Sequence, residues 1–427
     1  MQEWLQNLEP YELGGIRVAL LMLPILMFVP LIIWWERRLL SWMQDRLGPN
    51  RVATYTSKTG KKFRTFGLVQ PLFDGLKLLI KEDITPASVD RKLYFWAPAL
   101  ALFPAFTIGG TMPWGPQSGI WALLTPVADV EIGLLFVLAI SSLGVYGVVI
   151  AGYASNNKYS LLGGLRASAQ LISYELAMGV SLLCVVFATG SLKMTKLVEF
   201  QEAPLLGVVP WAQNWFVLTP YGLLAAIIFL VCMIAETNRT PFDLPEAENE
   251  LIAGYHTEYS SMKFAVFFMG EYAAMFVFSG IFACVFLGGY NIVPVNWEYL
   301  AAGGSGFFAF MAKANYWLAP VTFVGKCWLG VSFYIWLRAT LPRLRYDQLM
   351  SLGWKTLLPV AVANFMLVGF WLIMTDVYGP EIGWRGYGAS AILLAVLYWS
   401  YLSKVNTGKP GRERRTIKMV EPGRADG

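Results

Sequence analysis

The sequence predicts an all-α, polytopic membrane helical bundle, with eight core transmembrane helices, an interfacial amphipathic helix and a ninth, C-terminal transmembrane helix. Of its 427 residues 56% are hydrophobic and 14% are charged, whereas a soluble domain carries about 25% charged residues. The 17 Trp, 27 Phe and 20 Tyr suit rings that lie at two membrane–water interfaces. A water-soluble protein does not fit this composition.

Apolar runs long enough to span a bilayer, roughly 20 residues each, recur along the chain. The core spans lie near 15–35, 93–112, 130–152, 170–190, 217–236, 264–288, 318–337 and 355–375. They form one membrane domain, residues 1–376, and the segment 377–403 adds the extra transmembrane helix, near 387–402. The tail, 404–427, is rich in Lys, Arg, Gly and Pro, and we expect it to be disordered. The N-terminal residues lack the basic region of a signal peptide, so the first span is retained.

The distribution of Lys and Arg predicts the orientation in the membrane. These residues gather in the first, third and seventh loops and in the tail, whereas Pro113–Asp129 has none. Because basic loops stay inside, we expect a multi-pass protein of the bacterial cell (inner) membrane, with a periplasmic N-terminus and cytoplasmic main loops and tail. The net charge of +5 then reflects topology, not nucleic-acid binding.

One acidic loop, 235–259, follows the fifth span. Its ionisable residues are Glu236, Arg239, Asp243, Glu246, Glu248, Glu250, His256 and Glu258. A solvated acidic loop is one interpretation. The other is a proton-holding site, because crowded carboxylates at a membrane boundary disfavour one another's charge.

Four ionisable residues lie at or within the predicted spans: Glu131, Glu175, Glu271 and Lys326. An ionisable group at bilayer depth is unfavourable, so each should face the protein interior or a hydrated cavity. A single one would suggest a buried ion pair that fixes packing. Several together favour a proton-conducting path or a coupled binding site.

The segment 67–82 predicts an amphipathic helix at the membrane surface. Its apolar stripe is formed by Leu72, Leu76, Leu79 and Ile80, and Asp74, Lys77 and Lys81 lie off that stripe. Such a helix can lie at the interface and form a lintel over an apolar cavity. A packing helix is the simpler, compatible interpretation.

Five segments, at 36–52, 67–82, 141–179, 235–264 and 336–355, carry a family resemblance. They include DRLGPNR, GLVQPLFDGLKLLIKE, AQLISYELAMG, ETNRTPFDLPEAENE and LPRLRYDQLMSLGWK. Together they resemble the quinone-site membrane subunit of respiratory complex I, NADH:quinone oxidoreductase, which is the H subunit in bacteria and subunit 1 in mitochondria. The resemblance runs in order from about residue 14 to residue 375.

The resemblance implies a subunit of a multi-subunit, proton-translocating enzyme that forms much of the quinone chamber and couples quinone reduction to proton translocation. It implies ubiquinone or menaquinone as substrate, with no flavin, iron–sulfur cluster or haem bound by this chain. The implied partners are the peripheral-arm quinone-site and iron–sulfur subunits, adjacent small membrane subunits and membrane lipid, with no nucleic acid. Quinone would enter between the first span, the interfacial helix and the sixth span.

Site residues follow from the matching motifs. The quinone-chamber residues would be Arg46, Arg51, Gln70, Asp74, Arg239, Thr240, Phe242 and Asp243. The proton-path residues would be Glu131, Glu175, Glu236, Glu246, Glu248 and Tyr255. No catalytic residue is expected in this chain alone, and its four widely spaced cysteines predict no metal site.

Three segments depart from the family pattern: the insertion at 54–64, a long outer loop at 297–315, and the chain beyond Asp376. Three other functions stay open. The chain could be the equivalent subunit of a membrane-bound hydrogenase or of an F420- or ferredoxin-linked complex. It could also be a stand-alone ion-coupled transporter or a structural scaffold.

Overall fold

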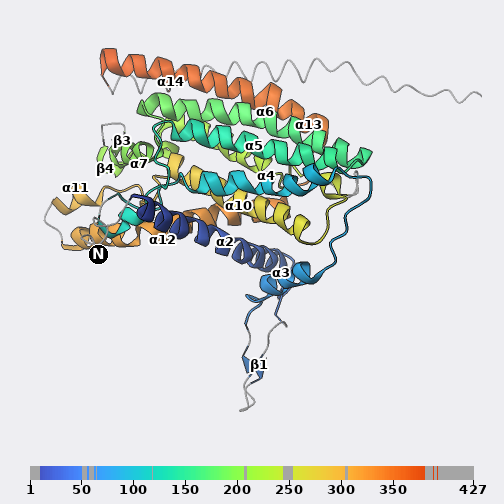
Figure 1. Cartoon of the computed structure of the whole chain (residues 1–427). Helices are drawn as coiled ribbons and strands as arrows, with labels where there is room; N and C mark the ends of the chain where they lie inside the picture. The colour runs from blue at the N-terminus through green and yellow to red at the C-terminus, as the bar shows by residue number, and fades with distance from the viewer. Residues whose placement is uncertain are drawn as a thin grey trace, which may run out of the picture.

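The computed structural model describes residues 10–50, 55–56, 62–63, 65–117, 119–205, 209–243, 253–302, 306–379, 388 and 392. Long helices lie roughly parallel in one bundle (Figure 1). The bundle helices are α2 (Pro10–Met43), α4 (Arg91–Gly109), α5 (Gly133–Ala154), α6 (Lys158–Thr189), α8 (Pro220–Glu236), α10 (Ser261–Phe286), α12 (Gly306–Thr340) and α14 (Leu358–Tyr378).

Short elements connect these helices. They are β1 (Tyr55–Thr56), β2 (Lys62–Phe63), α3 (Gln70–Ile80), the 3₁₀ helix η1 (Gly119–Leu124), α7 (Met194–Glu202), β3 (Pro204–Leu205), β4 (Val209–Gln213), the 3₁₀ helices η2 (Phe216–Leu218) and η3 (Gly254–His256), α11 (Trp297–Ala302), α13 (Tyr346–Ser351) and the π-helix η4 (Leu352–Leu357). The strands form only two-stranded antiparallel pairs, β1 with β2 and β3 with β4.

Six of the described helical segments are long and apolar enough to cross a membrane. They are Gly14–Met43, Gly133–Ala154, Lys158–Thr189, Ser261–Phe286, Gly306–Thr340 and Tyr346–Tyr378. The remaining bundle helices, α4 and α8, have 19 and 17 residues, which is about 26–28 Å at 1.5 Å per residue. They lie on the second and fifth predicted spans. The predicted all-α membrane bundle is confirmed.

Local sequence signals set several helix ends. The side chain of Asp90 accepts hydrogen bonds from the first backbone amides of α4, and Asn157 does the same for α6. The Thr219 side chain accepts from the amide of Gly222 at the start of α8. Such residues satisfy amides that have no partner within the helix. At the other end of α6, Gly190 takes a left-handed conformation with φ of 68°, which glycine adopts without a steric penalty.

Small residues allow the helices to approach one another closely. A Cβ atom on Gly147 of α5 would lie 2.6 Å from the backbone nitrogen of Ala101 in α4, and one on Gly163 of α6 would lie 2.8 Å from Cα of Gly254. Apolar burial does not drive helices together within lipid, so close packing of this kind stabilises the bundle. Within it, α10 is the most buried of the six long segments.

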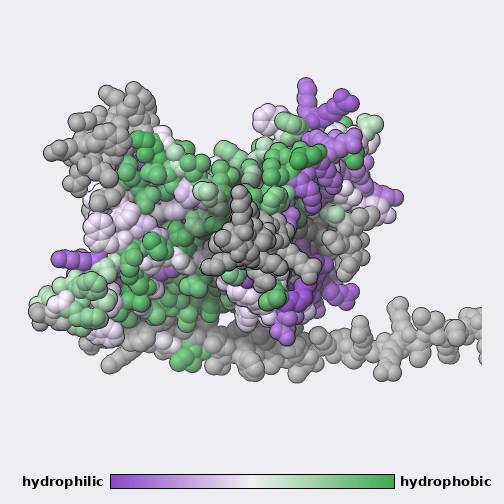
Figure 2. All heavy atoms as spheres, turned by 90° about the horizontal axis from the view of Figure 1, so that it is seen from below, coloured by the Kyte–Doolittle hydropathy of each residue, from purple (hydrophilic) through white to green (hydrophobic). Residues whose placement is uncertain are grey.

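The two ends of the bundle differ, and we call them the α3 end and the α7 end. At the α3 end lie α3, the β1–β2 hairpin and the C-terminal turn of α12, and at the α7 end lie α7, β3, β4 and α11 (Figure 1). Figure 2 shows a wide hydrophobic surface over the bundle, with hydrophilic residues gathered toward one end. This surface is that of a multi-pass membrane protein.

The structure changes two expectations and leaves a third outside its described part. The predicted outer loop at 297–315 is largely helical, because the apolar run Gly306–Ala312 starts α12 about twelve residues before the predicted span. The insertion at 54–64 contributes β1 and β2, which pair antiparallel. The ninth span, apart from two residues, and the basic tail lie outside the described residues, so they stay predictions.

Candidate functional site

Five polar side chains from four segments meet at the α3 end. Glu36 of α2 accepts a hydrogen bond from the Tyr272 hydroxyl at 2.7 Å and pairs with Arg338 of α12. The Arg239 guanidinium lies 3.9 Å from the carboxylate of Glu36 and 3.6 Å from that of Glu271. It also lies 4.3 Å from the centroid of the Tyr272 ring. Arg338, Glu36, Arg239 and Glu271 thus form an ionic chain of alternating sign.

The inner part of this ionic chain is buried, whereas Arg338 at its outer end is exposed. Glu36 is 4% exposed and Arg239 is 8% exposed. A buried charge without a partner is strongly unfavourable, and removing one member of a buried pair typically costs about 3–5 kcal/mol. A change of charge at one member must therefore change the electrostatic energy of the next member.

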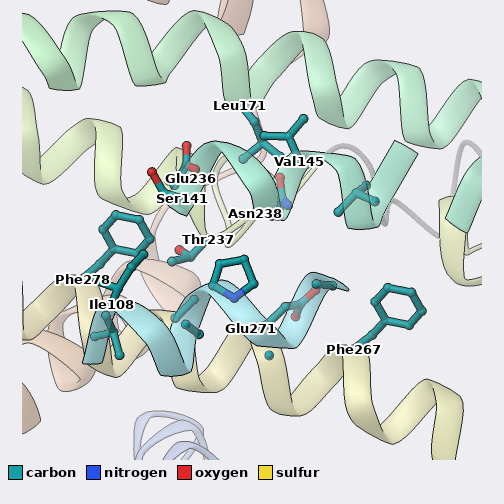
Figure 3. A pocket seen from close by; sticks show the side chains of 18 of the residues that line it. Ile108, Ser141, Val145, Leu171, Glu236, Thr237, Asn238, Phe267, Glu271 and Phe278 are labelled. Carbon is teal, nitrogen blue, oxygen red and sulfur yellow. The ribbon is translucent and has the colours of Figure 1, made fainter. Parts of the chain in front are cut away.

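A small cavity adjoins the ionic chain (Figure 3). Its volume is about 90 Å³, enough for several water molecules. The polar residues that line it are Ser141, Glu236, Thr237, Asn238, Tyr255 and Glu271. Its apolar walls include Ile108, Val145, Leu171, Phe267 and Phe278. The Tyr255 hydroxyl donates to Glu271 at 3.3 Å, so the ionic chain ends at a space that can hold water.

Two predicted proton-path carboxylates flank this region. Glu236, in the last turn of α8, lines the cavity, and its Oε2 atom has no hydrogen-bond partner within the described part of the chain. A water molecule in the cavity could donate a hydrogen bond to that atom. Glu175 of α6 accepts a hydrogen bond from Ser142 of α5. Glu236 thus lines the cavity, whereas Glu175 is partly exposed on α6 and is not among the lining residues.

The loop after α8 is held by contacts on both sides. Phe242 is 4% exposed, and its ring lies 5.3 Å from that of Tyr174. Asp243 forms a 3.0 Å ion pair with Arg343, which follows α12. Thr240 is partly exposed between them. The described part of this loop, which the sequence predicts to belong to the quinone chamber, is thus largely buried and is held against α6 and the chain after α12.

The start of α3 is tied to α2. Asp74 forms a 2.6 Å ion pair with Arg37 and accepts a 3.2 Å hydrogen bond from Gln70. The indole of Trp34 donates to the carbonyl oxygen of Phe66, just before α3, at 3.0 Å. Gln70 and Asp74 therefore lie together beside α2, and their role in the quinone chamber stays a prediction.

The end of α3 is tied to α10. The Ser261 hydroxyl donates to the carbonyl oxygens of Leu78 and Lys81 at 2.8 and 3.0 Å, and Lys263 pairs with Asp83 at 2.9 Å. The apolar stripe of α3 faces outward, with Leu72, Leu76, Leu79 and Ile80 between 51% and 84% exposed. Since α2 and α10 hold the helix at both ends, its exposed stripe faces lipid or another protein.

Some predicted site residues lie elsewhere. Arg46 is exposed after α2 and donates to Gln44. Glu131 is exposed before the first turn of α5, at the α7 end, far along the bundle from the ionic chain. Arg51, Glu246 and Glu248 lie outside the described residues, so their roles stay predictions.

Glu36, Tyr272 and Arg338 were not predicted as site residues, although they complete the ionic chain. Glu36 carries a usable signal, because it is a single carboxylate where a long apolar run ends. Arg338 was considered only as one of the basic loop residues that predict the orientation in the membrane. Tyr272 has no signal of its own, since its importance comes from Glu36, 236 positions away.

Lys326 does not join the carboxylates. Its ammonium donates to the carbonyl oxygens of Leu287, Gly289 and Asn291 at 2.5, 3.0 and 2.5 Å, and lies 4.1 Å from the centroid of a Trp215 ring. These carbonyls follow the C-terminus of α10, where a positive charge is favourable. Lys326 therefore joins α12 to the chain after α10 at the α7 end through backbone carbonyls, and not through the buried ion pair that the sequence suggested.

A family model described as NADH dehydrogenase matches residues 16–369. A protein of Geobacter metallireducens, named as an H subunit of NADH-quinone oxidoreductase, is 44% identical over 361 residues, 84% of this chain and 95% of its own length. Proteins with the same name from Flavobacterium johnsoniae and Cupriavidus pinatubonensis are 41% and 42% identical, over 81% and 87% of this chain and 90% and 98% of theirs. The chain belongs to the H-subunit family of NADH-quinone oxidoreductase. The resemblance seen in the motifs is confirmed.

Members of this H-subunit family belong to a multi-subunit enzyme. The family is quinone-associated, and other subunits of the oxidoreductase are its partners. The match covers α2 through most of α14. The ionic chain and the cavity therefore lie entirely within the family's region.

Proposed function

We propose that this chain is the membrane subunit of a proton-translocating NADH:quinone oxidoreductase that forms much of the quinone chamber and couples quinone reduction to proton translocation. The observation that carries the proposal is the ionic chain from the exposed Arg338 through the buried Glu36 and Arg239 to Glu271. It connects the α3 end, where quinone would be bound, with the cavity that Glu236 lines. The chain itself performs no redox step.

The quinone chamber would be completed by a peripheral subunit. Small-ligand pockets occupy about 300–1,000 Å³, and the inner cavity is smaller than this range, so it suits water and not a quinone headgroup. The exposed stripe of α3 offers an apolar surface along which an isoprenoid tail could pass between α2, α3 and α10. Arg46, Arg51 and the loop of Thr240, Phe242 and Asp243 would face the headgroup side.

Coupling would act through charge. Reduction of a quinone adds two electrons and takes up two protons, so the quinol is neutral. Until both protons arrive, the added electrons leave negative charge at the chamber. Because each member of the ionic chain touches the next, that charge alters the balance between Arg239 and Glu271. At a few ångströms and reduced dielectric constant, such an interaction amounts to several kcal/mol. The carboxylates Glu236 and Glu175 would then change protonation together, with Glu131, Glu246, Glu248 and Tyr255 extending the path.

A neighbouring membrane subunit would continue the proton path. Glu175 is partly exposed on the outer face of α6, between Ile172 and Leu176, which are 51% and 47% exposed. A carboxyl that faced hydrocarbon would be unfavourable, so this face suits a protein partner. The positive-inside pattern supports a periplasmic N-terminus and places the α3 end on the cytoplasmic side, where a peripheral arm would dock.

The substrate of the assembled enzyme would be ubiquinone or menaquinone, and this chain would bind no flavin, iron–sulfur cluster or haem. The first experiment measures quinone-dependent NADH oxidation in native membranes, with and without this chain, using an inhibitor of the complex I quinone site. Loss of inhibitor-sensitive oxidation supports the proposal. Unchanged NADH oxidation would favour the hydrogenase, F420 or ferredoxin alternative.

A variant tests the coupling role. Glu236→Gln should lower both quinone reduction and proton translocation at least tenfold in assembled complex reconstituted into liposomes. Glu199→Gln is the matched control, because Glu199 is exposed on α7 at the other end of the bundle. Normal rates in Glu236→Gln would support a scaffold in place of a coupling subunit. A chain that purifies alone and transports ions without partners would support the transporter alternative.

A further inference from the structure

One uncharged side chain holds both ends of the segment that carries Glu236 and Arg239. Gln170 of α6 is 1% exposed. Its amide nitrogen donates to the carbonyl oxygens of Ala235 and Phe242 at 3.0 and 2.9 Å. Ala235 directly precedes Glu236, and Phe242 lies three positions after Arg239. A single side-chain amide therefore binds the backbone just before Glu236 and again three residues after Arg239.

The carbonyl that Gln170 binds at Ala235 belongs to the last turn of α8. Carbonyl oxygens in a last turn have no regular helical partner, and here those of Ala235 and Met233 also accept from the backbone amides of Asn238 and Thr237, each at 3.2 Å. The Tyr334 hydroxyl of α12 donates to the Met233 carbonyl oxygen at 3.0 Å. The end of α8 is thus held by side chains of two neighbouring helices, and its position depends on them.

The same turn of α6 is itself fastened. The hydroxyl of Tyr174, four residues after Gln170, donates to the carbonyl oxygen of Leu349 in α13 at 2.9 Å, and its ring meets Phe242 edge-on. Glu175 follows directly. This part of α6 therefore carries one carboxylate of the proposed proton path and holds the segment that carries another.

We infer that Gln170 is a positioning residue that sets the separation of Glu236 from Glu175 and the placement of Arg239 between Glu36 and Glu271. The inference rests on the proposed function. Gln170 does not line the cavity, and an amide has no ionisable proton in the physiological range. Its amide also donates to the side-chain oxygen of Asn238 at 3.4 Å, so it acts through the backbone and one side chain of the segment that it holds.

The charge coupling between two carboxylates depends on their separation. Displacing the segment 235–242 should therefore change how the two groups share protons, not only how fast quinone is reduced. This expectation separates positioning from general stabilisation. A structural role alone would change the amount of assembled complex and leave each assembled complex with normal coupling.

The test compares Gln170→Met, Gln170→Glu and Gln170→Asn in purified, assembled complex reconstituted into liposomes. Methionine keeps the length and removes the donors, glutamate replaces them with acceptors, and asparagine keeps an amide that is one methylene shorter. The readouts are the amount of assembled complex, inhibitor-sensitive turnover, protons translocated per electron, and the pH profile of turnover. We expect Gln170→Met and Gln170→Glu to lower protons per electron at least twofold and to shift the pH profile. Gln170→Asn should be intermediate.

Gln201 provides a matched control. It is also a fully buried glutamine, and its amide donates to the carbonyl oxygens of Cys284 and Leu197 at 2.8 and 3.1 Å, but at the α7 end. Gln201→Met should reduce the amount of assembled complex and leave protons per electron unchanged. Comparing Gln170→Met with Gln201→Met then separates the effect of the position beside Glu236 from the effect of removing any buried glutamine.

Three results would overturn the inference. They are a normal proton ratio and pH profile in assembled Gln170→Met and Gln170→Glu, the same change of ratio in Gln201→Met, and failure of all three Gln170 variants to assemble. A wild-type complex without inhibitor-sensitive turnover would instead count against the proposed function.

Discussion

The Tyr272 hydroxyl donates a 2.7 Å hydrogen bond to the carboxylate of Glu36 and joins α10 to α2. Both residues are buried, and Glu36 also pairs with Arg338. A hydrogen bond to a charged group contributes about 1.5–3 kcal/mol. This contact therefore contributes to the ionic chain as well as to helix packing.

Tyr272→Phe tests that contact directly. The substitution removes one donor to Glu36 and keeps the ring beside Arg239, so we expect a lower thermal midpoint of the purified complex and a several-fold lower inhibitor-sensitive turnover. Tyr299→Phe is the control, because Tyr299 is 53% exposed on α11. Equal effects of the two substitutions would contradict a role of the Tyr272 hydroxyl in the ionic chain.

The pair Arg37–Asp74 offers a charge-swap experiment at the proposed quinone entrance. Exposed pairs of this kind contribute only about 0.2–1 kcal/mol to stability, so kinetics and not stability should respond. We expect Arg37→Asp alone to raise the KM for a long-tailed quinone several-fold, with a smaller effect on a short-tailed analogue. The double variant Arg37→Asp with Asp74→Arg should recover most of the loss. No recovery, or equal effects on both quinones, would argue against a guiding role for the pair.

Lys326→Met should destabilise the complex without changing its coupling. Methionine leaves three carbonyl oxygens after α10 without the ammonium that serves them, and each unsatisfied buried polar group costs about 1–3 kcal/mol. Thermal dissociation and protons per electron should be measured together. Lys313→Met, at an exposed position of the same helix, is the control. A changed proton ratio in Lys326→Met would point to the coupled role that the sequence also allowed.

A carboxyl at the α7 end predicts a pH dependence of stability. Glu202 lines an outer cavity of about 470 Å³. Burial raises the pKa of its carboxyl above the usual 4.5, Glu199 and Glu298 raise this pKa further, and hydrogen bonds from Asn291 and Tyr290 act in the opposite direction. The folded state therefore holds this proton more tightly than the unfolded state does.

The sign follows from proton linkage. Between the ordinary pKa and the raised pKa, the folded protein binds more protons, so the free energy of unfolding falls as pH rises through that window and stays lower above it. Glu202→Gln should remove this part of the pH dependence. Thermal midpoints from about pH 4 to about pH 8 would measure it, with Asp376→Asn, at an exposed position of α14, as the control. Parallel curves for wild type and Glu202→Gln would refute the assignment.

The predictable features were those that depend on composition and on local pattern. The length of an apolar run is set by the bilayer thickness, so hydropathy predicted eight core spans. The helical spacing of Leu72, Leu76, Leu79 and Ile80 indicated α3. The carboxylates Glu175 and Glu236 stood out because ionisable groups are rare in such runs. Helix α12 starts about twelve residues before the predicted span, because hydropathy marks the depth of the membrane and not the length of a helix.

The sequence by itself therefore determined the membrane class and the family, and it indicated the loop after α8 as a candidate part of the site. Only the tertiary structure decided which charges are partners. Arg239 lies between Glu36 and Glu271, Lys326 serves backbone carbonyls far from the carboxylates, and Gln170 holds the segment that carries Glu236. The physical reason is that an ion pair depends on distances between side chains of different helices. Periodicity fixes the face that each residue occupies on its own helix, but packing alone decides which faces meet.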